Sequence, residues 1–323
     1  RRRPDGSHPD FSQPMDITVV ICTYNGAERV PDVLESLHNQ AVPGGIEWEV
    51  LVIDNNSTDD TVDVVERTRT SWSADASLAC VTERRQGLAY ARQRAVEEAN
   101  GELVAFLDDD NIPNPDWVAE AVRFARENPR AGAFGGRLIG EYEVDPGRTF
   151  GLVKGLFALN DADSTFSYSE MGGGEFPPGA GLVVRRRAWH ECVPVELAST
   201  GVSAGSRANV GEDIMAQWFI HDAGWEVWHN ADMAARHRIP GSRFEPDYLD
   251  RFFDGIGNSR HRTRMVRYTA WKRPFATLAF GVSDLLKLAH LRWKYRHRWD
   301  DRFVQGKARM LKAMLRRPYL FQK

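Results

Sequence analysis

Three apolar segments that each run directly into polar residues constrain the fold of this chain more than any other feature. Residues 17–21 read ITVVI, residues 50–53 read VLVI and residues 103–107 read LVAFL. Short continuous apolar runs of this kind are typical of strands buried on both faces of a parallel sheet. The residues at the ends of these runs are Thr23, Tyr24 and Asn25, then Asp54, Asn55 and Asn56, then Asp108, Asp109 and Asp110.

Helical patterns separate these strands. After the first strand, apolar residues recur at helical spacing over residues 30–37, with Pro31 tolerable in the first turn. After the second, Ser57 or Thr58 is the expected N-cap of a helix that carries Asp59 and Asp60 in its first turn. We therefore expect helices to alternate with strands in the first half of the chain.

Two further helices flank the third strand. One is expected over residues 88–99, with Gly101 as its C′ residue. The other is expected to open with Asn114 as N-cap and Pro115 at the first helical position. This order predicts an α/β protein with a Rossmann-like, mixed and mostly parallel sheet that has helices on both faces, and such sheets bind ligands beyond the carboxyl ends of their strands.

The three consecutive aspartates need a compensating charge, because neighbouring carboxylates repel one another. A divalent cation such as Mg²⁺ or Mn²⁺ would supply it, since hard cations prefer carboxylate oxygens. Asp110 would hold the metal, and Asp108 or Asp109 would reach a ribose hydroxyl. A solvated acidic turn is the alternative. An EF-hand is excluded because Ile112 stands where an oxygen ligand is needed.

The second half of the chain is less regular. A short strand is expected after the Gly/Pro-rich stretch GGGEFPPGAG, and a helix after it at RRRAW. A polar, glycine-rich loop at residues 199–211 leads into Glu212 and Asp213, which begin a helix that closes at Gly224. A final strand brings His237 toward the site.

Four segments, in this order and spacing, resemble a family 2 glycosyltransferase of the GT-A fold. They are VVICTYNGAERVPDVLESLHNQ, EVLVIDNNSTDDT, GLAYARQRAVEEANGELVAFLDDDNIPNPDWV and GEDIMAQWFIHDAGWEVW. The resemblance covers roughly residues 16–240. One departure is Gln93, which stands where the family motif G-x-x-x-A-R-N has asparagine.

The resemblance implies a nucleotide-sugar donor site along the first three strands. Thr23, Tyr24 and Asn25 would meet the nucleoside, with Tyr24 able to stack on it. Asp54 would accept a hydrogen bond from a ring N–H of the base, which suits uracil but also guanine and thymine. The remaining implied donor contacts are Gly87 and Arg92 at the diphosphate, and Asp110 as the metal-binding end of the D-x-D motif.

The resemblance also implies an acceptor side. Asp213 corresponds to the general base of an inverting transfer, and Glu212 would orient the acceptor or the base. Gly179 and Gly181 would let a sugar approach, and His237 would complete the metal shell of Mn²⁺ or Mg²⁺. Each has a plainer alternative: first-turn acids favoured by the helix dipole, turn glycines and a solvated histidine.

The charge is distributed unevenly along the chain. Residues 259–323 hold 18 Lys/Arg against 3 Asp/Glu, whereas the rest holds 24 against 42. Residues 241–323 are therefore expected to form a basic helical extension after a catalytic domain at 16–240. Because aromatics and leucines alternate with its cations, docking on an anionic inner membrane is the leading interpretation. Packing against the acidic body is the alternative, and nucleic-acid binding is unlikely without a recognised module.

The remaining features fit a cytoplasmic enzyme, peripheral on the inner membrane face. Three cysteines form no even framework, and no apolar run reaches the length of a membrane span. The polar, Pro-rich residues 1–15 are expected to be disordered.

The sequence thus predicts a metal-dependent inverting glycosyltransferase, with UDP as the commonest carrier, that extends a cell-surface glycan or lipid-linked acceptor. A sugar nucleotidyltransferase and a catalytically silent binding module on the same fold are the rival hypotheses.

Overall fold

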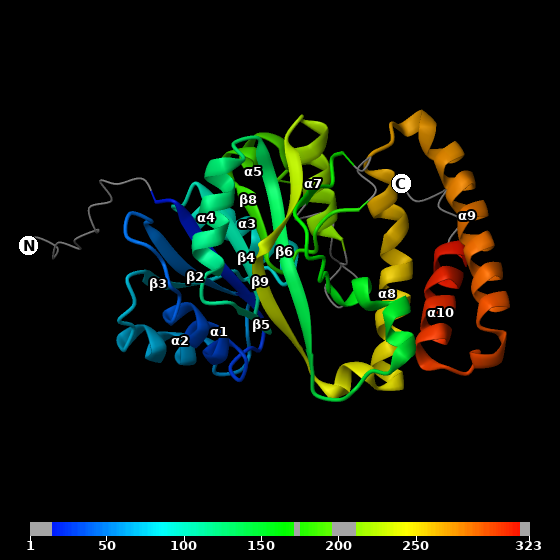
Figure 1. Ribbon diagram of the computed structural model, residues 1–323, viewed down its shortest axis with the longest axis horizontal. Coiled ribbons are helices and arrows are strands. Elements are labelled where there is room, and N and C mark those ends of the chain that lie inside the picture. Colours follow the sequence, from blue (N-terminus) through cyan, green and yellow to red (C-terminus); the bar gives the residue numbers. More distant parts are fainter. Residues whose placement is uncertain (1–14, 171–174, 196–210, 317–323) are drawn as a thin grey trace, which may run out of the picture.

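A computed structural model describes residues 15–170, 175–195 and 211–316. Within them, nine strands form one mixed sheet in the order β3-β2-β1-β4-β8-β6-β9-β5, with β7 paired to β9. Helices cover both faces of this sheet, and a separate group of helices lies at one end (Figure 1). The predicted mixed α/β fold is confirmed.

The first half of the chain builds the parallel part of the sheet. Its strands are β1 (Ile17–Thr23), β2 (Trp48–Asp54), β3 (Ser77–Thr82) and β4 (Leu103–Asp108). Thr23 pairs with Asp54, and Cys22 pairs with Asp108. Because the strands are parallel and in this register, all the predicted polar ends meet at one edge of the sheet.

Alternate side chains of β1 enter two different cores. Val19 and Ile21 pack on one face with α1 (Val30–His38), α2 (Thr61–Thr70) and α4 (Trp117–Glu127). Val20 packs on the other face with α3 (Leu88–Glu98), α5 (Arg186–Cys192) and α7 (Glu212–Asp222). The period of two in a strand therefore explains why continuous apolar runs fit here.

The second half adds strands around the end of β4. They are β5 (Asn111–Pro113), β6 (Ala131–Tyr142), β7 (Phe166–Ser167), β8 (Leu182–Arg185) and β9 (Glu226–Ile239). β8 runs antiparallel between β4 and β6, and β5 runs antiparallel to β9. The pairing of β5 with β9 sets Asn111 opposite His237, which brings the far end of β9 to the triple aspartate.

Three long helices end the described chain: α8 (Pro246–Met265), α9 (Arg273–Lys294) and α10 (Arg302–Arg316). α8 and α10 share a third apolar core with the 3-10 helices η1 (Arg148–Leu152), η2 (Lys154–Phe157) and η3 (Gly241–Phe244). Phe150, Phe253 and Phe303 lie at its centre. The predicted helical extension is present, and α8 and α10 pack on these 3-10 helices, whereas α9 lies on the outside (Figure 1).

Two predicted helix starts and one predicted helix end are wrong. α2 begins at Thr61 after Asp60, because Ser57 instead accepts a hydrogen bond from the Asn25 N–H, 2.9 Å away. α4 begins at Trp117, three residues after Asn114. Gly101 is no C′ residue: a Cβ there would strike the Thr18 backbone, so it serves a close approach of the chain.

Two expectations fall on parts that the structure describes little or not at all. The N-terminal tail lies outside the described residues except for Met15, whose carbonyl accepts a hydrogen bond from the Glu102 N–H. Residues 199–210 of the glycine-rich loop also lie outside them. No helix among the described ranges is both long and apolar enough to cross a bilayer.

Candidate active site

The three consecutive aspartates are held by different partners rather than by one. Asp109 accepts a hydrogen bond from the Thr23 hydroxyl at 2.6 Å and two from the Arg29 guanidinium at 2.8 and 3.0 Å. Gly26 leaves room for this arrangement, since a Cβ there would overlap Thr23 Oγ1. Both oxygens of Asp109 are therefore committed to the protein. Arg29 was missed in the sequence, where it looks like an ordinary residue at a helix start.

Asp110 faces the end of β9 and the segment after it. Arg243 Nη2 donates to Asp110 Oδ2 at 2.6 Å, and His237 Nε2 lies 3.5 Å from the same oxygen. Burial alone would raise the pKa of Asp110, but the hydrogen bond from His237 and the positive charges of Arg243 and Arg29 outweigh it and lower the pKa. Asp110 is thus held as a carboxylate.

The surroundings of Asp110 fit a divalent cation. Its Oδ1 is buried without a hydrogen-bond partner, and the His237 ring and the carboxylate already converge. Among the described residues, no three His, Cys, Asp or Glu side chains form a complete metal cluster. A site with two protein ligands leaves room for phosphate oxygens, as hard cations at nucleotide sites require. Arg243, which was missed in the sequence, contacts both Asp110 Oδ2 and His237 Nε2.

Arg92 connects the aspartates to the acidic start of α7. The side chain is buried, with Nη1 3.3 Å from Glu212 Oε1 and Nη2 3.9 Å from Asp108 Oδ1. Burial would lower the pKa of Arg92, but Glu212, Asp213 and Asp108 together raise it. Arg92 is therefore no surface residue of α3, because the helix turns its side chain into the site.

Asp108 and Glu212 have raised pKa values at the two ends of Arg92. Desolvation is the main cause for both: it raises the pKa of Asp108 to about 6 and that of Glu212 to about 7, against the lowering effect of Arg92. Asp108 keeps 37% of its side-chain surface exposed, at the floor of the crevice. Glu212 is buried, and its Oε2 has no partner among the described residues.

Asp213 is fixed from the opposite side by a glycine. The Gly179 N–H donates to Asp213 Oδ2 at 2.6 Å. A Cβ at Gly179 would lie 2.7 Å from that oxygen and would also strike Arg92. Position 179 must therefore be glycine for this contact. The hydrogen bond connects Gly179, predicted on the acceptor side, with Asp213, the predicted base. Gly181, with φ of +72°, donates its N–H to the Phe106 carbonyl and acts in the turn into β8.

A pocket opens beside the acidic pair. It is lined by Arg92, Gln93, Trp189, Glu212 and Asp213, together with Ala89 and Val193. The Trp189 indole N–H donates to Gln93 Oε1 at 3.2 Å. Gln93, the departure from the family motif, therefore faces this pocket wall rather than the triple aspartate.

The predicted nucleoside contacts lie along the ends of β1 and β2. Asp54 is buried and accepts a hydrogen bond from the Ser57 N–H. Asn25 has a left-handed backbone (φ +50°) and accepts a hydrogen bond from the Thr58 N–H, while the Tyr24 ring stays exposed. Their roles toward a nucleoside stay predictions, but the fold brings all three to the same edge.

Asn55 was placed at the end of the second strand by the sequence, without a specific role. Its amide donates to the Glu83 and Arg85 carbonyls, and its Oδ1 accepts from the Gly87 N–H at 2.7 Å. Gly87 has φ of +137°, which favours glycine, and it is the N-cap residue of α3. Asn55 thereby positions the loop that leads to Arg92. An asparagine directly after a buried strand was the available signal.

The family model described as glycosyl transferase family 2 matches residues 18–188. The chain is 32% identical over 106 residues to glycosyltransferase AglE of Haloferax volcanii, covering 33% of this chain and 34% of that protein. It is 31% identical over 121 residues to the putative teichuronic acid biosynthesis glycosyltransferase TuaG of Bacillus subtilis, covering 37% and 46%. The chain thus spans less than half the length of these two relatives.

Solved structures share the fold. Mannosyltransferase PcManGT from Pyrobaculum calidifontis, in complex with GDP-Man and Mn²⁺, superposes with a TM-score of 0.61 at 19% identity, covering 98% of this chain and 91% of that one. Staphylococcus aureus TarS in complex with UDP gives 0.51 at 17% identity, covering 93% and 89%. The family match extends over more than half of the chain, and the chain therefore belongs to glycosyl transferase family 2.

Proposed function

We propose that the protein is a metal-dependent, inverting glycosyltransferase that moves a sugar from a nucleotide-sugar donor to a glycan or lipid-linked acceptor in cell-surface polysaccharide synthesis. The observation that carries this proposal is Arg92, which joins Asp108 on the donor side to Glu212 on the acceptor side. The names of relatives in teichuronic acid and poly(ribitol-phosphate) synthesis support the pathway class. Residues 16–240 would be the catalytic domain and 241–323 its extension.

The donor nucleoside would lie along the ends of β1 and β2. Asp54 accepts a hydrogen bond from a ring N–H of the base, for which uracil is our choice, and Tyr24 stacks on the ring. Because both oxygens of Asp109 are taken by Thr23 and Arg29, Asp108 is the carboxylate that reaches the ribose. Thr23 therefore acts through Asp109, while Asn25 shapes the rim.

The diphosphate would lie between the Gly87 loop and Asp110. Asp110 and His237 would hold Mn²⁺ or Mg²⁺, which neutralises charge on the departing nucleoside diphosphate. Arg243 would have to release Asp110 Oδ2 for the cation to bind there. Arg92 keeps the crevice floor positive under the donor.

Asp213 would act as the general base. The Gly179 N–H fixes Oδ2, so Oδ1 takes the proton from the acceptor hydroxyl as that hydroxyl attacks the anomeric carbon. A single positioned base and a departing diphosphate suffice for a one-step transfer with inversion. Glu212, whose raised pKa keeps a proton available near neutral pH, would donate a hydrogen bond to the acceptor.

Calorimetric titration with UDP, GDP and dTDP, each with Mn²⁺ and with chelator, tests the donor site. We expect one nucleotide to bind only with metal, and Asp110→Ala to weaken that binding at least about 10²-fold, since a direct ligand matters no less than the groups that orient it. Asp116→Ala, an exposed aspartate before α4, is the matched control.

Turnover assays on the same protein separate the rival functions. A nucleotidyltransferase would convert a nucleoside triphosphate and a sugar phosphate into nucleotide sugar and pyrophosphate, and a silent module would bind nucleotide without turning over any donor. Failure of all three nucleotides to bind with either metal would overturn the proposal. We place the enzyme in the cytoplasm, on the inner face of the plasma membrane.

A further inference from the structure

Helix α9 carries a stripe of exposed apolar side chains that no described part of the chain covers. The stripe includes Trp271 just before the helix and ends at Trp293; its other large members are Phe275, Leu278, Leu285 and Leu286. Phe275 and Leu278 are each 70% exposed, and Trp293 is 68% exposed. Phe275, Leu278, Val282 and Leu286 follow one another at intervals of three or four residues, and Trp293 lies seven positions after Leu286, so these side chains share one face of the helix.

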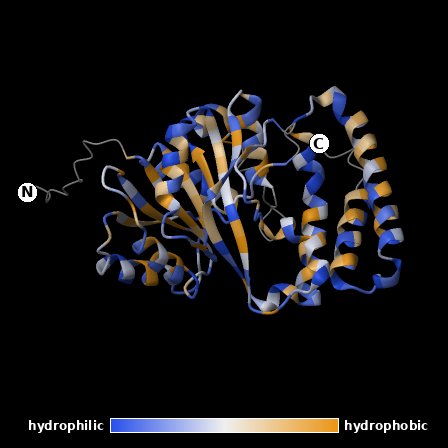
Figure 2. Cartoon of the chain, viewed as in Figure 1, coloured by the Kyte–Doolittle hydropathy of each residue, from blue (hydrophilic) through white to orange (hydrophobic). Residues whose placement is uncertain are grey.

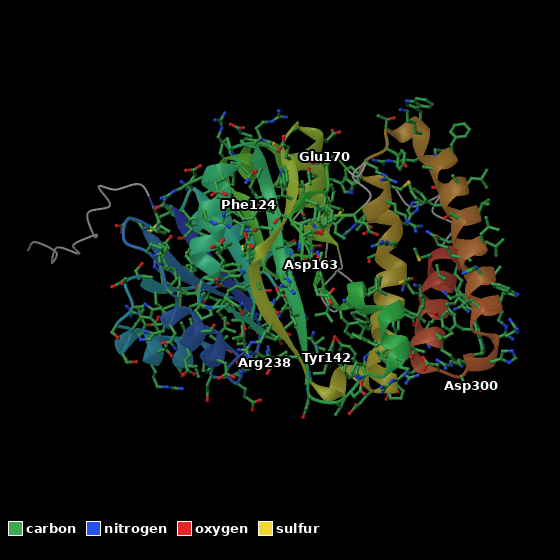
Figure 3. All side chains as sticks on the ribbon, in the orientation of Figure 1. Phe124, Tyr142, Asp163, Glu170, Arg238 and Asp300 are labelled. Carbon is green, nitrogen blue, oxygen red and sulfur yellow. The ribbon has the colours of Figure 1, made fainter. Side chains whose placement is uncertain are left out.

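The opposite face of α9 is the one that packs on the protein. Asp284 is buried there and receives two hydrogen bonds from Arg264 of α8, at 2.6 and 3.0 Å. Leu291 is buried on the same side and joins the third core. Because α9 packs on the protein through this inward face, the exposed stripe is a second apolar face and not the edge of the core. In Figure 3 the side chains on the outer edge of α9 project away from the rest of the protein, and Figure 2 shows apolar residues along the helix.

Positive charge surrounds the stripe. The exposed basic residues are Lys272, Arg273, Lys287, Arg292, Lys294, Arg296 and Arg298. Asp284 is the only acidic residue between positions 267 and 299, and it is paired inward. Among the described residues none of these seven cations forms a salt bridge with a carboxylate. Two copies of this face would repel each other, which disfavours a second copy of the chain as the partner.

We propose that α9 docks on an anionic lipid bilayer, lying in the interface with the Trp271-to-Trp293 stripe inserted among the acyl chains and its cations at the headgroups. Tryptophan at both ends and leucine in the middle, with Lys and Arg along the sides, is the composition of interfacial helices. The helix is about 33 Å long at 1.5 Å per residue, and it lies along the surface rather than across it.

This surface deepens the proposed function, because α9 adjoins the acceptor side. Arg267 lies over the Phe280 ring of α9 at 5.6 Å and over the Trp218 ring of α7 at 5.3 Å. α7 begins with Glu212 and Asp213. A bilayer against α9 would therefore hold the acceptor-side helix near the surface where a lipid-linked acceptor resides.

Vesicle flotation with the full chain tests the proposal. The vesicles are phosphatidylcholine alone and phosphatidylcholine mixed equally with phosphatidylglycerol. We expect at least about tenfold tighter binding to the anionic vesicles, weakened by added salt. Phe275→Ser with Leu286→Ser should reduce this binding at least about tenfold, and Lys287→Glu with Arg292→Glu should abolish the preference for anionic lipid. Val195→Ser and Arg130→Glu, both exposed and away from α9, are the controls.

Three results would overturn the proposal. One is no binding of the wild type to either vesicle. Another is equal binding by wild type and both α9 double variants. The third is a wild-type dimer in analytical ultracentrifugation that the Ser variants dissociate. A second apolar pair, Leu278→Asn with Leu285→Asn, must repeat the loss, and metal-dependent nucleotide binding must persist in all α9 variants. If wild-type lipid binding fails while nucleotide binding persists, only the α9 proposal fails. If nucleotide binding fails while lipid binding persists, only the proposed donor site fails.

Discussion

Two groups of carboxylates face each other across Arg92, and they differ in how their charge is balanced. The triple aspartate (Asp108, Asp109 and Asp110) is surrounded by Arg29, Arg92, His237 and Arg243. The acidic pair (Glu212 and Asp213) has Arg92 and Arg262 nearby and a glycine N–H on Asp213. The pKa of Asp110 is lowered, whereas that of Glu212 is raised.

The difference teaches that acidic residues in one crevice can be tuned for opposite tasks by their fixed neighbours. Where several cations converge, burial is outweighed and the carboxylate stays charged, as a ligand for a cation must. Where burial prevails, the acid keeps its proton and can donate a hydrogen bond. Asp110 is thus suited to binding a cation, and the acidic pair to moving a proton.

Asp213→Asn should break the acidic pair's function while leaving the triple aspartate intact. We expect the transfer rate at saturating donor to fall about 10³-fold, within the range that a general base contributes, while nucleotide affinity stays unchanged. The amide keeps the size and still accepts from the Gly179 N–H. Asp222→Asn, at the other end of α7, is the control. A parallel loss of nucleotide binding would contradict the separation of the two groups.

Arg92→Met should damage both groups at once. It removes the buried cation between Asp108 and Glu212, and leaving a buried charge unpaired costs about 3 kcal/mol or more. We expect a loss of this size in the free energy of unfolding, measured with urea at neutral pH. The loss should be smaller at pH 5, where both acids can take up protons.

Arg94→Met is the matched control for Arg92 on the same helix. Arg94 is partly exposed and pairs with Glu98 one turn later, an interaction worth about 0.5 kcal/mol. Equal destabilisation by the two variants would mean that Arg92 contributes only packing, and that the two carboxylate groups are not coupled through it.

Much of the donor side could be predicted from the sequence. The apolar runs fixed which residues end β1, β2 and β4, and parallel pairing brought those ends together. Arg29 and Arg243 could not be found in this way. They lie 80 and 133 positions from their aspartate partners, and no local pattern distinguishes an arginine that folds inward from one on the surface.

The extension was only half predictable for a different reason. Its composition predicted basic amphipathic helices, but α8 and α10 bury their apolar faces in the third core while α9 has apolar residues on two opposite faces. Periodicity identifies an apolar face and does not say what covers it. The three-dimensional packing was needed to show which face of α9 is left outward.

The pH dependence of stability should differ in sign between Glu212 and Asp110. The folded pKa of Glu212 is raised from an ordinary value of 4.5 to about 7. Its contribution is therefore complete below pH 4.5 and is lost as the pH rises toward 7. The lowered pKa of Asp110 acts oppositely: its contribution is present above its usual pKa of 3.8 and is lost at lower pH.

Glu212→Gln isolates the first of these effects. The amide resembles the protonated acid. As the pH rises from 5 to 7.5, we therefore expect the free energy of unfolding of the variant to increase by about 2 kcal/mol relative to that of the wild type. Urea unfolding at the two pH values measures this. Glu191→Gln, on an exposed glutamate of α5, should leave the difference between the two pH values unchanged. A variant with the same pH dependence as the wild type would show that Glu212 is ionised throughout.

Arg243→Ala tests whether the arginine competes with a divalent cation at the triple aspartate. Arg243 Nη2 holds Asp110 Oδ2, and Nη1 lies 3.2 Å from His237 Nε2, so a guanidinium and a divalent cation compete for the same atoms. Removing a hydrogen bond to a charged group, worth about 1.5 kcal/mol, should raise the affinity for Mn²⁺ alone about tenfold. Electron paramagnetic resonance of free Mn²⁺ measures it without nucleotide, and Arg236→Ala, whose side chain pairs with Glu141, is the control. An unchanged or lower affinity would mean that Arg243 does not compete with the cation. In that case Arg243 would be needed to keep Asp110 ionised, and the arginine would support binding of the divalent cation instead of opposing it.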